Sequence, residues 1–196
     1  FILYAHTSLP EEERNLAHIR HLLTQDKTDF NLTLAEIENC KEPLAVRAVT
    51  AFRNADEKVR SGILSTLNSH MSICDSPALK ANMARSEIDF KNLKTDEITY
   101  YLCIPPDKLK TYAALVRLFM GMALLEMKRT TATSRSRFPV LFMLDEFPAL
   151  GRIKEIEDNL AYIAGYGVRI WFFAQDIKQL AHCYGEKAQS IFANCH

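Results

Sequence analysis

The stretch VLFMLDEFPALG, residues 140–151, decides the fold of this chain. Five apolar residues run without interruption into two adjacent carboxylates, Asp145 and Glu146, and Pro148 then ends the run. A strand without polar alternation is typical of a parallel sheet that is covered on both faces. The stretch therefore predicts a buried parallel strand with two acids at its carboxyl end.

A second strand of the same kind is predicted at VRIWFFAQD, residues 168–176, which ends at Gln175 and Asp176. Between the two strands, RIKEIEDNLAYIAGYG (152–167) predicts a helix that is closed by its glycines. IKQLAHCYG and EKAQSIFAN, which together span 177–194, predict two more helices. Strands that alternate with helices at this spacing indicate an α/β sheet with right-handed crossovers.

The segment just upstream extends the same pattern. EITYYLCI (97–104) is rich in β-branched and aromatic residues and ends at two prolines, so it predicts a further strand. DKLKTYAALVRLFMGMALLEMKR (107–129) predicts a long helix that is apolar on most of its circumference and is therefore well buried. TTATSRSR (130–137) is a polar linker.

The first ninety residues differ from the rest because their apolar residues recur at helical spacing. A kink is expected at Ser61-Gly62, within the longest of these periodic segments. We therefore divide the chain into an all-α domain, 1–90, and a sheet-containing domain, 91–196. The predicted helices of the first domain are 9–25, 32–40, 43–73 and 76–84.

The composition is that of an ordinary globular protein. Of 196 residues, 48% are hydrophobic, and 24 basic residues balance 24 acidic ones. This balance argues against a broad nucleic-acid-binding surface, which needs excess positive charge. The five cysteines lie far apart in no metal-binding spacing, which favours a reducing compartment. No stretch is apolar for long enough to form a membrane helix. Because the chain opens at Phe1 without Met, we expect it to be part of a longer protein.

Ligands of open parallel sheets bind at the carboxyl ends of the strands, where Asp145, Glu146 and Gln175 are expected. In nucleotide hydrolysis an Asp can hold the Mg²⁺ shell, while a Glu accepts a proton from the attacking water. A neutral amide can hydrogen-bond that water or the terminal phosphate without adding negative charge. The alternative is that the two acids begin an ordinary solvated turn.

The phosphate-binding half of such a site is missing from the sequence. A nucleotide hydrolase of this kind needs a glycine-rich loop that ends in Gly-Lys, and no Gly-Lys dipeptide occurs in the 196 residues. If the carboxylates serve ATP, the loop must lie upstream of Phe1. The isolated chain is then expected to hydrolyse little or no ATP.

The ordered set DEFPALG (145–151), AGYG (164–167) and Gln175-Asp176 closely resembles the coupling-protein ATPases of conjugation and type IV secretion, in the TraG-like branch. The resemblance covers roughly the whole chain and is weakest in the first forty residues. Further similar segments are SGILSTLNSHMSICDSPAL (61–79), RSEIDFKNLK (85–94) and YYLCIPPDKL (100–109).

This resemblance implies the fold and the setting of the parent protein. The fold is α/β: residues 91–196 are the C-terminal part of a RecA-like parallel-sheet nucleotide-binding domain, preceded by an inserted all-α domain, residues 1–90. Such proteins are homo-hexameric motors anchored at the cytoplasmic face of the bacterial inner membrane, where they meet other type IV secretion components. Residues 1–90 would contact the relaxosome or secretion effectors and adaptors, and DNA can pass through the hexamer pore.

The resemblance also implies roles for particular residues. Asp145 would coordinate Mg²⁺ through water, Glu146 would activate the attacking water, and Gln175 would sense the γ-phosphate of ATP. Some relatives carry basic residues before the Gln strand that act across subunits as an arginine finger. This sequence has AGYG there instead. Arg152 and Arg169 are therefore the nearest candidates for a trans arginine.

Two other functions remain open. The slightly acidic helical half could be a substrate or adaptor docking module without catalysis of its own. The chain could also belong to an FtsK-like DNA translocase, although a helical insertion ahead of the Asp-Glu strand favours the coupling protein. The sequence leaves open whether the cargo is DNA, protein or both.

Overall fold

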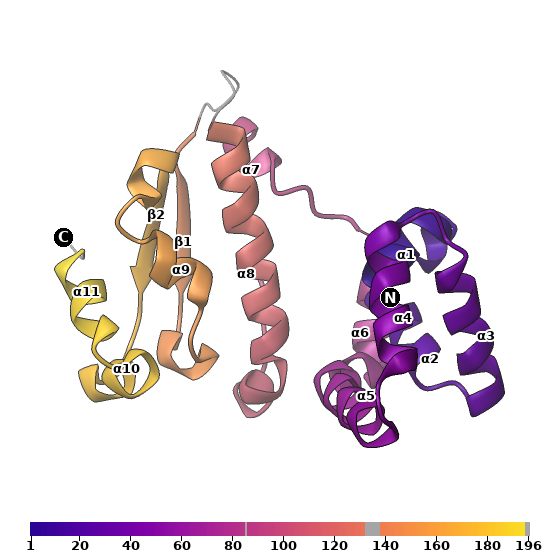
Figure 1. Ribbon diagram of the computed structural model, residues 1–196. Helices are drawn as coiled ribbons and strands as arrows, with labels where there is room; N and C mark the ends of the chain where they lie inside the picture. Colours follow the sequence, from indigo (N-terminus) through magenta and orange to yellow (C-terminus); the bar gives the residue numbers. More distant parts are fainter. Residues whose placement is uncertain (85, 132–137, 195–196) are drawn as a thin grey trace. The chain divides into compact units, whose positions relative to one another are not determined.

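The structure, a computed structural model, describes residues 1–84, 86–131 and 138–194 (Figure 1). The chain divides into two compact units, Phe1–Glu87 and Ile88–His196. Most of the predicted linker 130–137 lies outside the described residues. Among the residues that are described, no helix is both long and apolar enough to cross a membrane.

The described residues of the first unit form helices and no strand, with bounds that differ from the ranges predicted at 9–25 and 32–40. Short 3₁₀ turns, η1 (Glu11–Glu13) and η2 (Ser72–Asp75), connect parts of it. Its helices are α1 (Ile2–Ser8), α2 (Leu16–Leu23), α3 (Lys27–Glu38), α4 (Pro43–Asn54), α5 (Glu57–Met71) and α6 (Pro77–Met83).

Side-chain caps explain where several of these helices begin. The side chain of Asn15 accepts a hydrogen bond from the backbone of α2, and that of Asp26 accepts two from α3. Glu42 caps α4, and Pro43 occupies the first position of that helix, where its missing N–H costs nothing. Local sequence thus sets these boundaries.

The single helix predicted over 43–73 is wrong, because it is divided into α4 and α5 ahead of Ser61-Gly62. The helix breaks earlier, because Ala55 adopts an extended conformation with ψ 153° and Asp56 takes the N-cap position of α5. The chain then remains helical through Gly62. Asp56 makes no side-chain capping hydrogen bond, and the interior glycine, which costs about 1 kcal/mol, does not end the helix.

Polar contacts and small apolar clusters hold the helical unit together. The hydroxyl of Tyr4 donates to Glu36 at 2.8 Å, and Arg20 on α2 grips the carboxylate of Asp75 with two hydrogen bonds of 3.0 and 2.9 Å. None of the residues of α5 is buried. The buried cluster members are Tyr4, Leu22, Leu34, Ile37, Ala45 and Val49 in one group and Ala5, Ile19 and Leu23 in the other.

The second unit is mixed α/β. Its two strands, β1 (Val140–Leu144) and β2 (Val168–Phe172), pair in parallel, as predicted, with Val140 opposite Val168 and Leu144 opposite Phe172. The remaining elements are α7 (Asn92–Thr95), η3 (Pro106–Lys108), α8 (Leu109–Thr131), η4 (Phe147–Leu150), α9 (Lys154–Asn159), η5 (Ile163–Tyr166), α10 (Ile177–Tyr184) and α11 (Lys187–Ala193).

The strand predicted at 97–104 is not formed. Within the described residues the sheet consists of β1 and β2, and neither pairs with this segment. Ile104 packs against the core, but Ile98 and Tyr101 are exposed. A strand exists only where a neighbour accepts its backbone hydrogen bonds, so strand-forming residues alone do not make one.

The prediction that the strands are covered on both faces is wrong for the described residues. Val140, Leu144 and Val168 are buried, but Met143 and its partner Trp171 are 59% and 56% exposed. Apolar side chains therefore line both faces, and only one face carries a covering layer here.

A buried lysine ties the amino-terminal edge of the sheet together. Lys94 on α7 is fully buried, and its Nζ donates to the carbonyls of Met127 at 2.7 Å and Tyr166 at 2.6 Å. The backbone N–H of Phe138, just before β1, donates to the carbonyl of Lys94 at 3.2 Å. Burial lowers the pKa of Lys94. The Lys94 side chain thus links α8 to the entry of β2, and the backbone carbonyl of the same residue binds the entry of β1.

Candidate functional site

The candidate site lies where β1 and β2 end. Because the strands are parallel and Leu144 pairs with Phe172, the residues that follow both strands emerge at the same edge. The pairing continues past the strands, since Phe173 N–H donates to the carbonyl of Leu144 at 3.0 Å and Phe147 N–H to that of Phe173 at 2.9 Å. This extended ladder brings Asp145 and Glu146 next to Ala174 and Gln175.

The predicted site residues contact one another through one hydrogen bond between side chains and one from the backbone. Gln175 Nε2 donates to Glu146 Oε1 at 2.5 Å, and Asp145 Oδ1 accepts the backbone N–H of Glu146 at 3.1 Å. Asp176 is used differently, because its carboxylate caps α10 by accepting the Lys178 N–H at 2.8 Å. The structure therefore brings together Asp145, Glu146 and Gln175.

The backbone of Glu146 is in the left-handed region, with φ 47° and ψ 41°. Among the described residues it is the one non-glycine residue with positive φ. This conformation costs about 1–2 kcal/mol for a residue that has a Cβ. Such strain persists only where the surrounding structure holds it, and it concentrates at functional sites.

The site opens into a depression of ≈ 270 Å³. Exposed carboxylate oxygens at its rim are ligands that Mg²⁺ prefers. No group of three or more His, Cys, Asp or Glu side chains in the described parts of the chain could hold a metal ion by itself. The two carboxylates of Asp145 and Glu146 fit Mg²⁺, which usually keeps several waters and binds through one or two carboxylates and substrate phosphates. The lining residues are Asp145, Glu146, Phe172, Phe173, Ala174 and Gln175.

The two candidate trans arginines occupy different places. Arg152 grips the carboxylate of Glu157 through Nε at 2.5 Å and Nη2 at 2.8 Å, and Lys187 pairs with the same carboxylate. Hydrogen bonds from these two cations lower the pKa of Glu157 to about 2. Arg169 pairs in register with Leu141, near the amino-terminal ends of the strands and so away from Glu146.

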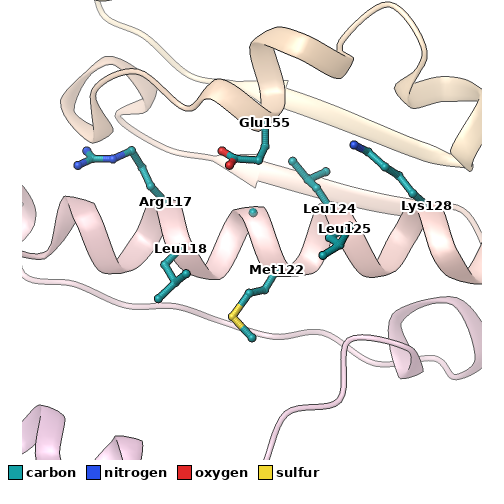
Figure 2. A pocket seen from close by; sticks show the side chains of 8 residues that line it. Arg117, Leu118, Met122, Leu124, Leu125, Lys128 and Glu155 are labelled. Atoms are coloured by element: carbon teal, nitrogen blue, oxygen red, sulfur yellow. The ribbon is translucent and has the colours of Figure 1, made fainter. Parts of the chain in front are cut away.

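A second depression, of ≈ 330 Å³, runs along α8 beside α9 (Figure 2). Figure 2 shows Arg117 and Lys128 on α8, with Glu155 of α9 between them. A Cβ at Gly121 would meet the Glu155 side chain at 3.4 Å, so the two helices pack closely here. Arg117 links this depression to the candidate site, since its Nη1 donates to the carbonyl of Leu150 in η4 at 2.6 Å.

Sequence reasoning missed the side chains that hold the turn after Glu146. Arg117 carried a signal, because it is a charged residue inside an otherwise apolar helical segment. The Sγ of Cys183 donates to the carbonyl of Pro148 at 3.3 Å, and the hydroxyl of Tyr184 accepts the Ile153 N–H at 3.1 Å. Neither of these two residues carried a signal in the sequence. Their contacts join residues more than thirty positions apart.

Comparison with known proteins connects this geometry to a family. VirD4, a type IV secretion system-coupling protein of Bartonella quintana, is 30% identical over 202 residues, which cover 98% of this chain and 31% of that protein. VirD4 of Agrobacterium fabrum is 28% identical over 172 residues, covering 87% of the chain and 26% of that protein. The conjugal transfer protein TraG of Escherichia coli is 26% identical over 175 residues, covering 84% and 27%.

The chain thus spans about a quarter to a third of the length of these relatives. The family model described as "Type IV secretory system Conjugative DNA transfer" matches residues 6–196, nearly the whole chain. On this match the chain belongs to the family of type IV secretion coupling proteins that act in conjugative DNA transfer.

Proposed function

We propose that this chain carries the hydrolytic half of an ATP-driven coupling protein that recruits DNA–protein or protein substrates to a type IV secretion system. The observation that carries the proposal is the contact between Gln175 and a left-handed Glu146, beside Asp145, at the carboxyl edge of two parallel strands. An ordinary solvated turn would relax the strained residue, whereas a catalytic one has reason to keep it.

Each of the three side chains has a separate task in the proposed reaction. Bound Mg²⁺-ATP supplies an electrophilic terminal phosphate. The carboxylate of Asp145, which accepts the Glu146 N–H, would hold the hydration shell of Mg²⁺ when the metal is bound. A carboxylate oxygen of Glu146 accepts the proton of the attacking water. Gln175 Nε2 fixes the rotamer of that carboxylate and, as a neutral amide, can also face the γ-phosphate without repelling it.

Membership of the family supports a proposal for the setting of this chain. The second unit is the C-terminal part of a RecA-like nucleotide-binding domain, and the helical unit is an all-α insertion in it. The phosphate loop is supplied by another part of the protein, which works as a hexamer at the cytoplasmic face of the inner membrane. Because Arg152 is already paired with Glu157, an arginine acting across subunits must exchange that partner or come from elsewhere.

The helical unit is proposed to select the cargo. The relatives named for conjugal transfer and type IV secretion motivate this role. On α5 the apolar residues Val59, Ile63 and Leu67 are exposed and recur at intervals of four, so they lie along one side of the helix. We assign this side to an effector or adaptor protein. The second candidate function, a docking module without catalysis, rests on the same residues.

ATP turnover by the full-length protein tests the catalytic proposal. Glu146→Gln keeps the side-chain shape but removes the base, so we expect kcat to fall by at least about two orders of magnitude. We also expect added DNA to stimulate the parent protein. Glu186→Gln, an exposed acid at the start of α11, is the matched control and should hydrolyse ATP at the parent rate. If Glu146→Gln hydrolyses ATP as fast as the parent, the docking module becomes the better account.

A further inference from the structure

The turn that begins at Glu146 is held by side chains from elements outside it. A residue in the left-handed region stays there only if its neighbours cannot relax. Phe147, the next residue, is fully buried. In order along the turn, the contacts are Phe147 N–H to the Phe173 carbonyl at 2.9 Å, Cys183 Sγ to the Pro148 carbonyl at 3.3 Å and Arg117 Nη1 to the Leu150 carbonyl at 2.6 Å.

Tyr184 at the end of α10 closes the turn. Its side chain is buried, with 4% of the residue exposed, and its ring stacks on that of Phe147 with centroids 5.5 Å apart and planes at 21°. The Tyr184 hydroxyl accepts the Ile153 N–H at 3.1 Å and donates to the carbonyl of Gly151 at 3.4 Å. One side chain therefore contacts both the beginning and the end of the turn.

The hydroxyl of Tyr184 is suited to this double role. Burial raises the pKa of Tyr184, although the hydrogen bond from Ile153 opposes the change. The phenol therefore keeps its proton at physiological pH and can donate to Gly151. Without the hydroxyl, a buried N–H and a carbonyl would both lose a partner, and an unsatisfied buried polar group costs about 1–3 kcal/mol.

Helix α10 connects this clamp to the other side of the site. Gln175, which holds the Glu146 carboxylate, lies just before the N-cap residue Asp176, and Tyr184 is the last residue of the helix. Gln175 precedes this eight-residue helix and Tyr184 ends it. The helix therefore connects the residue that binds the Glu146 carboxylate with the residue that holds the backbone after Glu146.

We propose that Tyr184 is a positioning residue for hydrolysis: its hydroxyl and ring hold the turn 147–153 so that Glu146 keeps the left-handed conformation in which its carboxylate faces the attacking water. This inference rests on the proposed function, since it gives Tyr184 a role only through Glu146. Tyr184 itself does not line the depression at the candidate site.

The test substitutes Tyr184→Phe in the full-length protein, which removes the hydroxyl and keeps the ring on Phe147. We expect kcat for ATP to fall about tenfold or more, because a small displacement of a reacting group is costly. KM for ATP should change less than about twofold, since the phosphates are bound elsewhere. Tyr162→Phe, at an exposed tyrosine between α9 and η5, is the control and should leave both constants unchanged.

A double-mutant cycle separates positioning from general damage. If Tyr184 acts through Glu146, then Tyr184→Phe should have almost no further effect on the residual single-turnover rate of Glu146→Gln. An equal loss in both backgrounds would overturn the inference, because a merely structural role lowers activity regardless of the base. An unchanged kcat for Tyr184→Phe would also overturn it.

The two proposals fail differently. If Glu146→Gln retains full turnover, the catalytic assignment fails, and the role of Tyr184 fails with it. If Glu146→Gln is inactive while Tyr184→Phe is as active as the parent, only the positioning role fails. Nucleotide binding by each variant, followed with a fluorescent ATP analogue, shows that the compared proteins are loaded alike.

Discussion

The helical unit, Phe1–Glu87, and the α/β unit, Ile88–His196, place their strong ion pairs in opposite surroundings. In each unit an arginine grips a carboxylate with two hydrogen bonds: Arg20 with Asp75, and Arg152 with Glu157. In the first pair Asp75 is 53% exposed and Arg20 is 13% exposed, whereas in the second Glu157 is 3% exposed and Arg152 is 56% exposed. Each pair therefore joins one exposed and one largely buried side chain, but the buried partner is the arginine in the first pair and the carboxylate in the second.

The two units also differ in how they bury their apolar residues. The helical unit divides its buried residues between small clusters and leaves α5 with none, whereas the α/β unit gathers its buried residues into one large cluster that includes Phe147 and Tyr184. A catalytic turn must be held from many sides, while a recognition surface needs exposed apolar side chains. The two units therefore suit the two tasks proposed for them.

The largest expected effect on stability comes from truncating one fully buried side chain in the core of each unit, in separate variants. Phe147→Ala should lower the free energy of unfolding of the α/β unit by about 3–5 kcal/mol, and Ile37→Ala that of the helical unit by about 2–5 kcal/mol, because each creates a cavity. Hydrogen exchange read by mass spectrometry on peptides from each unit measures the loss. Each substitution should deprotect its own unit; loss of protection in both units after either change would show that they unfold together.

A smaller effect is expected from the ion pair of the buried Glu157 carboxylate, and it depends on pH. The folded-state pKa of Glu157 is about 2, against an ordinary value of 4.5. Because this pKa is depressed, the pair stabilises the folded state above about pH 4.5, and this stability is lost as the pH falls toward about 2. Glu157→Gln should therefore lower Tm at neutral pH and flatten the decline of Tm in acid.

Asp75→Asn is the matched comparison in the helical unit. Hydrogen bonds from Arg20 lower the pKa of Asp75 too, but solvent screens this exposed carboxylate, so its replacement should change Tm less. Thermal unfolding followed by circular dichroism across the acid range measures both variants. Equal changes would contradict the contrast drawn between the two pairs.

The smallest effect on stability is expected on α5. Ile63→Ser removes an exposed apolar side chain, so the free energy of unfolding should change by less than about 0.5 kcal/mol. Binding of a secretion effector or adaptor by the full-length protein should nevertheless weaken. Co-purification of that substrate with the parent and the variant measures it, with Tm as the check on folding. Unaltered binding would remove α5 from the proposed recognition surface.

Much of the local structure could be predicted from the sequence. The helical character of the first unit follows from its periodicity, but the helices predicted at 9–25 and 32–40 start instead after the caps Asn15 and Asp26, which bind N–H groups of the next turn. The apolar runs ending at Leu144 and Phe172 likewise predicted two parallel strands. Strand 97–104 was wrong because its residues favour a strand but the neighbour that would pair with it is not a local property.

The sequence by itself determined which carboxylates and which amide stand at the ends of the two strands, because strand ends and side-chain types are written in consecutive residues. Only the tertiary structure decided that Gln175 reaches Glu146, that Glu146 is left-handed and that Tyr184 closes the turn. These features depend on residues about thirty positions apart that meet only after the strands pair and α10 packs on η4. Long-range contacts carry no periodicity of their own, so their partners appear only in the folded chain.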